Sequence, residues 1–219
     1  MLNKYAEQIH VRPFNGRSDL TSSDEGFVQW SQKVEAPLVV EVGCGAGLHP
    51  IFWAKQNPYG RMIAIERTKE KFSAFKNRVT QHQRGAAELT NLFPVNADAR
   101  DWLPVHISKE TIDKYFFLYP NPYPKKSQSN KRFHRSPFMH WIVESLKPEG
   151  EIEMASNLPW YINEAAQYMT QLWPLQIIDR RPIPLGFKAR THFEKKYLLR
   201  REPCENIRFK KIATPLPRE

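Results

Sequence analysis

The chain has few of the features that mark secreted, metal-binding or membrane proteins. Only two of its 219 residues are cysteine, Cys44 and Cys204, and their separation matches no metal-ligand spacing. A disulfide framework is therefore not expected, which suits a reducing compartment. No apolar run approaches the roughly 18 residues of a membrane span, and the first residues hold no signal-peptide apolar region. We expect a soluble, cytoplasmic protein with neither a membrane nor a metal as partner.

Acidic residues are scarce relative to basic ones. The chain carries 33 Lys and Arg against 23 Asp and Glu, a formal net charge of +10. Such an excess favours a polyanionic partner, nucleic acid before an anionic membrane. The length suffices for one α/β domain with a substantial core.

Two common nucleotide-binding patterns are also missing. An apolar run over residues 38–42 leads into Gly43, Gly45 and Gly47. The sixth position of a dinucleotide fingerprint would need glycine where this chain has Leu48, and no P-loop pattern occurs. A buried strand, a glycine bend and a following helix nevertheless make a nucleotide-type pocket. The spacing E-x-G-x-G-x-G from Glu41 resembles motif I of class I methyltransferases that use S-adenosylmethionine (AdoMet).

The periodicity of apolar residues predicts alternating strands and helices along the chain. The predicted helices cover residues 25–33, 48–56, 69–83, 136–146 and 158–173. The predicted strands cover residues 37–43, 61–66, 92–96, 112–119, 151–157, 175–179 and 191–200, with the last antiparallel to its neighbour. From residue 203 we expect a basic tail.

Carboxylates follow two of these strands. Glu66 ends the second strand, 25 residues after Glu41, where a ribose-binding acid belongs in such a unit. Asp98 follows the third strand between Ala97 and Ala99, which leave room for a flat ring. The adenine amino group could donate to this carboxylate.

A proline-rich loop follows the fourth strand. Pro120, Pro122 and Pro124 fix φ three times in five residues, so the loop is stiff. A stiff loop after a central strand lies where an open α/β sheet places its chemistry. The segment after it alternates cations with Tyr123 and Phe133, a combination suited to phosphates and stacked bases of RNA. The cations are Lys125, Lys126, Lys131, Arg132 and Arg135.

Three stretches together resemble the TrmB-type family of tRNA (guanine-N7) methyltransferases. They are residues 41–47 with Glu66 and Arg67, residues 119–126 with the basic run to Arg132, and Thr191-His192-Phe193-Glu194. The second is similar to the family's F-P-D-P-W-x-K-K loop and the third to its T-x-[FY]-E. The resemblance covers about Arg12 to Arg201.

The resemblance implies a Rossmann-like class I methyltransferase fold, α/β, with a mostly parallel seven-stranded sheet in the order 3-2-1-4-5-7-6, an antiparallel last strand, and helices on both faces. The domain would span residues 35–202, after a basic N-terminal arm and first helix (1–34) and before a basic tail (203–219). The implied AdoMet ligands are Glu41, Gly43, Gly45, Gly47, Glu66, Arg67, Asp98, Ala99 and Asn121. The implied guanine pocket is lined by Asn121, as the catalytic residue, with Lys125, Asn157, Thr191 and Glu194. The residues expected to grip tRNA are Arg12, Arg17, Lys126, Lys131, Arg132 and Arg135.

The chain departs from the family at three positions. Asn121 replaces an Asp, Asn157 replaces what is usually an Asp, and Tyr123 replaces the usual Trp. Guanine N7 carries a lone pair and no proton, so its methylation needs no general base, and alignment and electrostatics can suffice. Positive charge grows on the purine during transfer, and an amide stabilises it less well than a carboxylate. We expect activity to be retained or altered, with less electrostatic help.

Two alternatives remain open at this stage. The paired Asp-to-Asn changes fit a tRNA-binding protein with a methyltransferase fold and little or no catalysis. Asn121-Pro122-Tyr123 also loosely resembles the N-P-P-Y loop of enzymes that methylate an exocyclic amine, although Tyr123 stands where the second proline belongs. The methylated guanine and the choice between monomer and homodimer are left open.

Overall fold

The computed structural model describes Phe14 and residues 25–32, 36–85 and 88–212 of the chain. The strands are β1 (Leu38–Val42), β2 (Arg61–Ile65), β3 (Leu92–Val95), β4 (Ile112–Leu118), β5 (Leu146–Ser156), β6 (Leu175–Pro182) and β7 (Glu205–Lys211). The α-helices are α1 (Glu25–Ser31), α2 (Leu48–Gln56), α3 (Lys69–Gly85), α4 (Ala99–His106), α5 (Phe138–Ser145), α6 (Pro159–Leu172) and α7 (His192–Leu199). Two short 3-10 helices, η2 (Lys126–Lys131) and η3 (Phe133–Arg135), follow the proline-rich loop.

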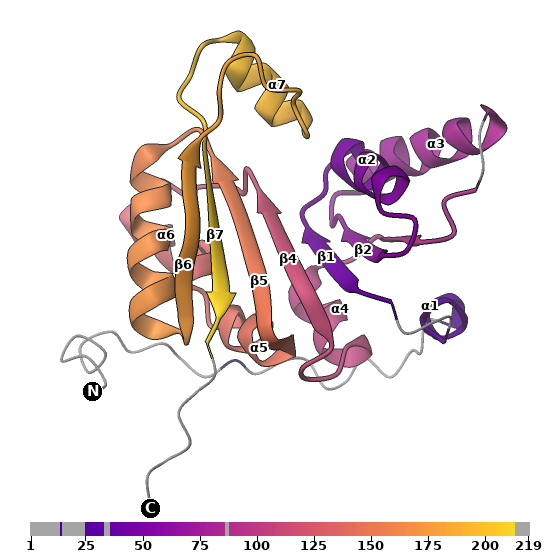
Figure 1. Cartoon of the computed structure of the whole chain (residues 1–219), viewed down its shortest axis with the longest axis horizontal. Coiled ribbons are helices and arrows are strands. Elements are labelled where there is room, and N and C mark those ends of the chain that lie inside the picture. Colours follow the sequence, from indigo (N-terminus) through magenta and orange to yellow (C-terminus); the bar gives the residue numbers. More distant parts are fainter. Residues whose placement is uncertain (1–13, 15–24, 33–35, 86–87, 213–219) are drawn as a thin grey trace, which may run out of the picture.

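The seven strands form a single sheet in the order β3-β2-β1-β4-β5-β7-β6, which confirms the expected topology (Figure 1). Strands β1 to β5 pair in parallel, and β7 lies antiparallel between β5 and β6. The parallel strands therefore end at one edge of the sheet, where Gly43, Glu66 and Tyr119 follow β1, β2 and β4. This carboxyl edge collects the loops that the sequence singles out.

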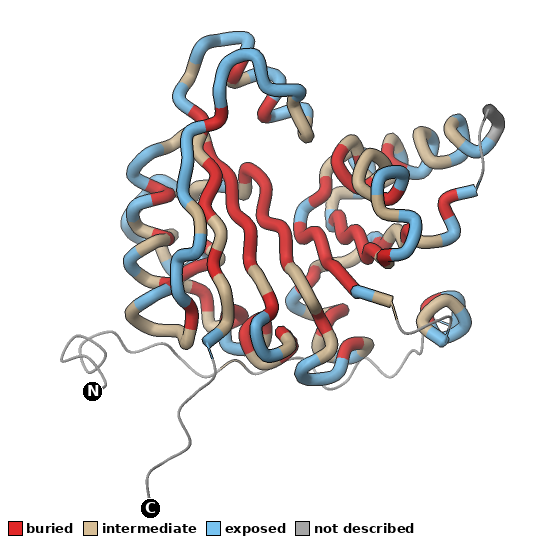
Figure 2. Tube along the Cα trace, viewed as in Figure 1, coloured by how far each residue is buried: buried red, intermediate tan, exposed pale blue. Residues whose placement is uncertain are grey.

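Helices cover both faces of the sheet, as expected for a doubly wound fold. On one face, Phe75 of α3 and Ala54 of α2 pack with Met62 and Phe116 of the sheet. On the other face, buried residues of α4, α5 and α6 pack with the alternate side chains of the same strands. The central strands are consequently buried along most of their length (Figure 2).

The predicted strand at 191–200 is wrong, because α7 occupies most of this range. Thr191 Oγ1 accepts a hydrogen bond from Glu194 N–H at 3.0 Å, so the T-x-x-E spacing is a helix N-cap. The last strand is instead β7, inside the segment that we expected to be a tail. Ile207 and Phe209 of β7 are fully buried, and the boundary at residue 203 therefore divides the sheet.

Two further elements differ from the sequence prediction. β5 begins at Leu146, five residues before the predicted strand at 151–157, and its pairing with β4 shifts register in these added residues. Such an irregularity accommodates Pro148 and Gly150 within a strand. α4 was not predicted. Among the described residues, no helix combines the length and apolar character needed to cross a membrane.

Candidate active site at the carboxyl edge of the sheet

The glycine bend between β1 and α2 requires glycine at each of its three positions. Gly43, Gly45 and Gly47 have φ values of 78°, 60° and 77°, which residues with a Cβ adopt only with strain. A Cβ on Gly43 or Gly45 would meet no atom within 4 Å, whereas one on Gly47 would lie 1.9 Å from Phe75 Cδ2. The first two glycines thus border open space, and the third permits close packing on α3.

Glu66 holds this bend against the end of β2. Its Oε2 accepts a hydrogen bond from Gly45 N–H at 3.0 Å and its Oε1 accepts one from Thr68 N–H at 2.8 Å. Glu41 is buried in β1, and its Oε2 lies 2.7 Å from His49 Nδ1. Glu66 therefore supports the backbone of the bend, whereas Glu41 binds the side chain of His49 in α2.

Asp98 and Ala99 lie at the start of α4. Asp98 caps the helix by accepting from Arg100 N–H at 3.0 Å, and Arg100 Nη2 lies 2.6 Å from its Oδ2. Burial raises the pKa of Asp98, but the hydrogen bonds and charge of Arg100 outweigh this effect and lower it overall. Arg67 is exposed, with Nη1 3.8 Å from Asp98 Oδ2. The carboxylate is therefore ionised and already has cationic neighbours.

The proline-rich loop after β4 is bounded by two tyrosines with positive φ. Tyr119 has φ 54° and Tyr123 has φ 43°, which are rare values for bulky residues. Asn121 is exposed between them, and its Oδ1 accepts a hydrogen bond from Tyr123 N–H at 3.2 Å. Among the described residues, Asn121 Nδ2 has no partner. Asn121 therefore uses its oxygen within the loop and leaves its amide donors free.

Tyr119 and Glu194 connect the loop to α7. Tyr119 Oη donates to Glu194 Oε1 at 3.0 Å, and Glu194 is fully buried. Glu194 also accepts from the guanidinium of Arg190 and from Arg190 N–H, the latter at 2.6 Å. Burial and the hydrogen bond with Cys204 raise the pKa of Tyr119, so the phenol stays protonated as a donor. Glu194 thus supports Tyr119 through a buried hydrogen bond, whereas the resemblance implied a place for it in the guanine pocket.

Arg190 is a central residue that the sequence did not single out. Its Nη1 donates to Glu153 Oε1 at 2.7 Å and to Asn206 Oδ1 at 3.0 Å, which ties α7 to β5 and β7. Burial alone lowers the pKa of Arg190, but Glu194 and Glu153 outweigh it and raise the pKa overall. Asn157, after β5, is held in turn by Glu202, whose Oε2 lies 2.7 Å from Asn157 Nδ2.

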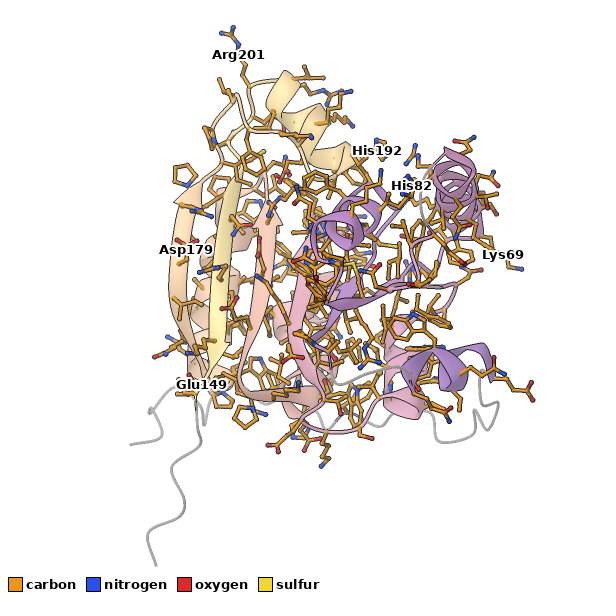
Figure 3. The ribbon with its side chains drawn as sticks, turned by 45° about the vertical axis from the view of Figure 1, so that its right-hand side comes forward. Lys69, His82, Glu149, Asp179, His192 and Arg201 are labelled. Atoms are coloured by element: carbon orange, nitrogen blue, oxygen red, sulfur yellow. The ribbon has the colours of Figure 1, made fainter. Side chains whose placement is uncertain are left out.

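α7 also reaches across to the glycine bend. Figure 3 shows His192, at the start of α7, near the helix that carries His82. Arg78 of that helix, α3, has its Nη1 2.6 Å from His192 Nε2 and 2.8 Å from the carbonyl oxygen of Ala46. Because burial and the Arg78 charge lower the pKa of His192, its Nε2 can accept this hydrogen bond. Figure 1 accordingly shows α7 beyond the ends of β4 and β5.

The basic segment after the loop divides into exposed and buried cations. Lys125, Lys126 and Lys131 are exposed, and Arg135 is half-buried over the Tyr168 ring at 4.8 Å. Arg132 is buried, with 7% of its surface exposed. It is therefore not placed as a surface cation for tRNA, which corrects our expectation for this residue. Arg12 and Arg17 lie outside the described residues.

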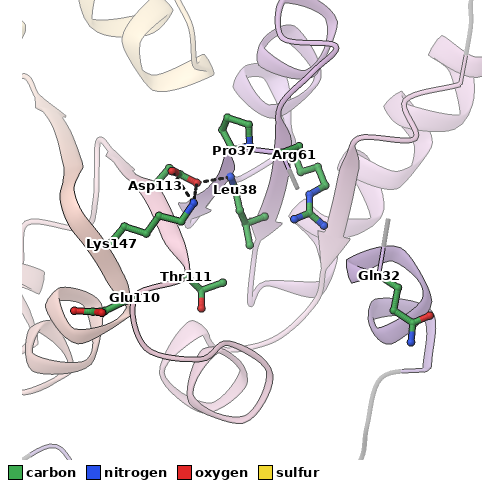
Figure 4. A pocket seen from close by; sticks show the side chains of 9 residues that line it. Gln32, Pro37, Leu38, Arg61, Glu110, Thr111, Asp113 and Lys147 are labelled. Carbon is green, nitrogen blue, oxygen red and sulfur yellow. Dashed lines mark hydrogen bonds and ion pairs between the residues drawn. The ribbon is translucent and has the colours of Figure 1, made fainter. Parts of the chain in front are cut away.

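A separate cavity lies at the opposite edge of the sheet. Figure 4 shows this cavity of about 830 Å³, next to Leu38 and Arg61 at the beginnings of their strands. Asp113 in its wall is already bound by Lys147 Nζ at 2.9 Å and by Leu38 N–H at 2.8 Å. No group of three His, Cys, Asp or Glu side chains suited to a metal occurs in the described part of the chain. The carboxyl edge therefore remains the candidate site.

Comparison with known proteins supports this assignment. A family model described as "Putative methyltransferase" matches residues 35–203. The tRNA (guanine-N(7)-)-methyltransferase of Syntrophotalea carbinolica is 26% identical over 164 residues, covering 75% of this chain and 68% of the relative. The enzyme of the same name from Nitrosomonas eutropha is 28% identical over 171 residues, covering 71% and 74%.

Solved structures share the fold at lower identity. The 16S rRNA methyltransferase KamB superposes with a TM-score of 0.65 at 19% identity, covering 93% of this chain and 100% of its own. An antibiotic-related methyltransferase gives a TM-score of 0.64 at 14% identity, covering 88% and 95%. The fold and the motif resemblance are confirmed together, and the chain belongs to the methyltransferase family whose model spans residues 35–203.

Proposed function

We propose that this protein transfers a methyl group from AdoMet to N7 of a guanine in tRNA. The observation that carries the proposal is the adjacency of the glycine bend and the proline-rich loop. β1 and β4 pair in parallel with Glu41 opposite Phe116, so Gly43 and Tyr119 follow neighbouring strands at the same edge. A donor over the bend would then lie beside a base held by the loop.

The residues at the bend fit AdoMet. The open space next to Gly43 and Gly45 would accept the methionine part, with Glu41 nearby in β1 and Gly47 packed against Phe75. The second lone pairs of the Glu66 oxygens can accept ribose hydroxyls, and Asp98, with Ala99 and Arg67 nearby, would face the adenine. When bound, AdoMet supplies an electrophilic methyl group on its sulfonium.

The work left to the chain is alignment of the base. Guanine N7 attacks through its own lone pair, so no residue has to remove a proton. Asn121 would offer its Nδ2 donors to an acceptor on the purine, because its oxygen is used by Tyr123 N–H. Lys125, Asn157 and Thr191 would complete the pocket, with Glu194 fixing Tyr119 from below.

The amide at position 121 changes the electrostatics relative to the family loop. An Asp in the same turn would use one oxygen for the Tyr123 N–H and retain a second, charged oxygen toward the purine. Charge-assisted hydrogen bonds are roughly twice as strong as neutral ones, so this chain stabilises the growing positive charge less. We therefore infer a slower chemical step, without loss of substrate alignment.

The tRNA would lie over the basic segment. Lys126 and Lys131 are exposed there, and Arg135 is partly exposed, with Lys131 Nζ 5.9 Å from the Tyr123 ring centroid. Arg12 and Arg17 would add contacts from the N-terminal arm. We propose that the protein acts in the cytoplasm, because tRNA is the proposed substrate.

The test is methylation of unmodified tRNA with labelled AdoMet. The expected product is labelled N7-methylguanine in the tRNA, recognised by the lability of this base to alkali. Label on an exocyclic amine would instead show an enzyme that methylates exocyclic amines, as the similarity to the N-P-P-Y loop suggested. Binding of AdoMet and tRNA without label transfer would indicate a binding protein instead.

A further inference from the structure

Arg132 behaves unlike the other cations of the basic segment. It lies between η2 and η3, and only 7% of its surface is exposed, although the neighbouring Lys131 is exposed. Its guanidinium faces the proline-rich loop and α6. A cation placed in this way has a different task from phosphate binding.

One side of the guanidinium binds the backbone of the loop. Arg132 Nε donates to the carbonyl oxygens of Pro122 and Tyr123 at 3.1 and 3.2 Å, and Nη2 donates to Tyr123 O at 2.9 Å. A longer bond of 3.4 Å joins Nη2 to Pro124 O. Three consecutive carbonyls of a segment that forms no strand are thus satisfied by one side chain.

The other side of the guanidinium binds α6. Arg132 Nη1 lies 2.7 Å from both carboxylate oxygens of Glu164, and the guanidinium stacks over Trp160 at 4.8 Å. Glu164 is held further by His134 Nε2 at 2.7 Å and Arg135 Nη1 at 3.3 Å. Burial opposes ionisation, but the His134 and Arg132 contacts outweigh it and lower the pKa of Glu164 to about 2.

The anchor itself is rigid. Tyr161, Ile162, Ala165 and Met169 of α6 are buried in the core against the sheet. Glu164 therefore provides a fixed point, and Arg132 transmits that fixed position to the loop. A continuous chain of contacts runs from Glu164 through Arg132 to the Tyr123 backbone, whose N–H binds Asn121 Oδ1.

We propose that Arg132, anchored by Glu164, is a positioning residue that holds the strained loop, and with it Asn121, in the geometry required for methyl transfer. The inference rests on the proposed function for its catalytic readout. The positive φ of Tyr123 persists only if the surroundings impose it. Arg132 donates two hydrogen bonds to the Tyr123 carbonyl oxygen and one to the carbonyl oxygen of its neighbour Pro122. The planar guanidinium of arginine has several N–H donors and can bind carbonyl oxygens and a carboxylate at once, whereas the ammonium group of lysine cannot do so in this geometry.

The test uses two variants that keep every charge. Arg132→Lys replaces the guanidinium with an ammonium group, and Glu164→Asp shortens the side chain that carries the carboxylate by one methylene. Both should lower kcat roughly 10- to 100-fold, because small misplacement of a reacting group costs about that much. KM for tRNA, the salt dependence of tRNA affinity and affinity for the demethylated product should stay at the wild-type values.

Two further variants serve as controls, one for the loss of a phosphate contact and one for the loss of an exposed ion pair far from the site. Lys131→Ala, next to Arg132, should raise KM for tRNA and flatten the salt slope, as loss of one phosphate contact does. Lys109→Ala removes an exposed pair with Glu144, at 3.1 Å on the far edge of the sheet, and should match wild type in every measurement. A raised KM for tRNA with wild-type kcat in Arg132→Lys would overturn the proposal and make Arg132 a tRNA contact.

Hydrogen exchange separates this inference from the proposed function. The Tyr123 amide should exchange at least about tenfold faster in both charge-conserving variants than in wild type, whether or not tRNA is methylated. Unchanged exchange in both variants would refute the proposal that Arg132 and Glu164 hold the loop in place. If wild type lacks methyl transfer but the Tyr123 amide exchanges faster in both variants, the proposed function fails and the positioning role of Arg132 stands.

Discussion

Alanine substitutions at Gly45 and Gly47 should separate two kinds of glycine in the same bend. Both residues have positive φ, 60° and 77°, so both variants pay the strain of a left-handed conformation, about 1–2 kcal/mol. Only at Gly47 does the new Cβ overlap an atom, since Phe75 Cδ2 lies 1.9 Å away. At Gly45 the Cβ enters open space.

The geometry sets the expected magnitudes. Overpacking of a buried ring adds about 1–3 kcal/mol, so Gly47→Ala should lose about 2–5 kcal/mol of stability and Gly45→Ala about 1–2. For a chain of this length, 1 kcal/mol corresponds to roughly 2–4 °C in Tm, which predicts a fall of about 4–20 °C for Gly47→Ala. The methyl of Gly45→Ala should instead cost about tenfold or more in affinity for the demethylated product.

Thermal unfolding and calorimetry with the demethylated product measure both effects. Gly47→Ala should have the lower Tm of the two variants, and Gly45→Ala the weaker heat of binding at a temperature where both are folded. A Gly47→Ala variant within about 2 °C of wild type would show that Phe75 moves aside freely. Unchanged binding by Gly45→Ala would place the nucleotide elsewhere.

Three further outcomes follow from the site. Asn121→Asp should raise turnover or leave it unchanged, because it restores a carboxylate oxygen beside the purine; a large loss in the labelling assay would show that the amide is required. Tyr119→Phe removes the phenol that donates to buried Glu194 at 3.0 Å, and should lower the free energy of unfolding in urea by about 1–3 kcal/mol, whereas no change would mean that Arg190 satisfies Glu194 alone. The folded-state pKa of Glu164 is lowered to about 2 from an ordinary 4.5, so its contribution to stability is full above pH 4.5 and is lost as the pH falls toward 2. Acid titrations of stability should therefore be less steep in Glu164→Gln, and identical profiles would refute the assignment.

The local pattern of the sequence determined the elements around the glycine bend. Residues 48–56 and 61–66 were predicted within a residue of α2 and β2, because each element's apolar period and its turn residues agree. The glycine bend was predicted as well, since three positive φ values at alternate positions require glycine and little else. Pro94 lies in β3, which is an edge strand of the sheet, where a residue without a backbone N–H is tolerated.

Tertiary structure decided the C-terminal part. Residues 191–200 were predicted as the last strand and residues 205–211 as part of a tail, whereas the structure makes the first segment mostly helix and the second a strand. β7 is the strand because Ile207 and Phe209 fill the core between β5 and β6. α7 is a helix because Thr191 caps it and Glu194 meets Arg190 and Tyr119.

Whether a charged side chain is buried and paired or exposed likewise depended on residues distant in the sequence. Lys131 and Arg132 are neighbours of the same sign, and only the position of Glu164, 32 residues away, makes one a surface cation and the other a buried clamp. Tyr119 meets Glu194 across 75 residues, and Arg78 meets His192 across 114. Apolar periodicity is a local property that a sequence displays directly, whereas the desolvation and pairing of a polar group depend on which distant segments the sheet brings together.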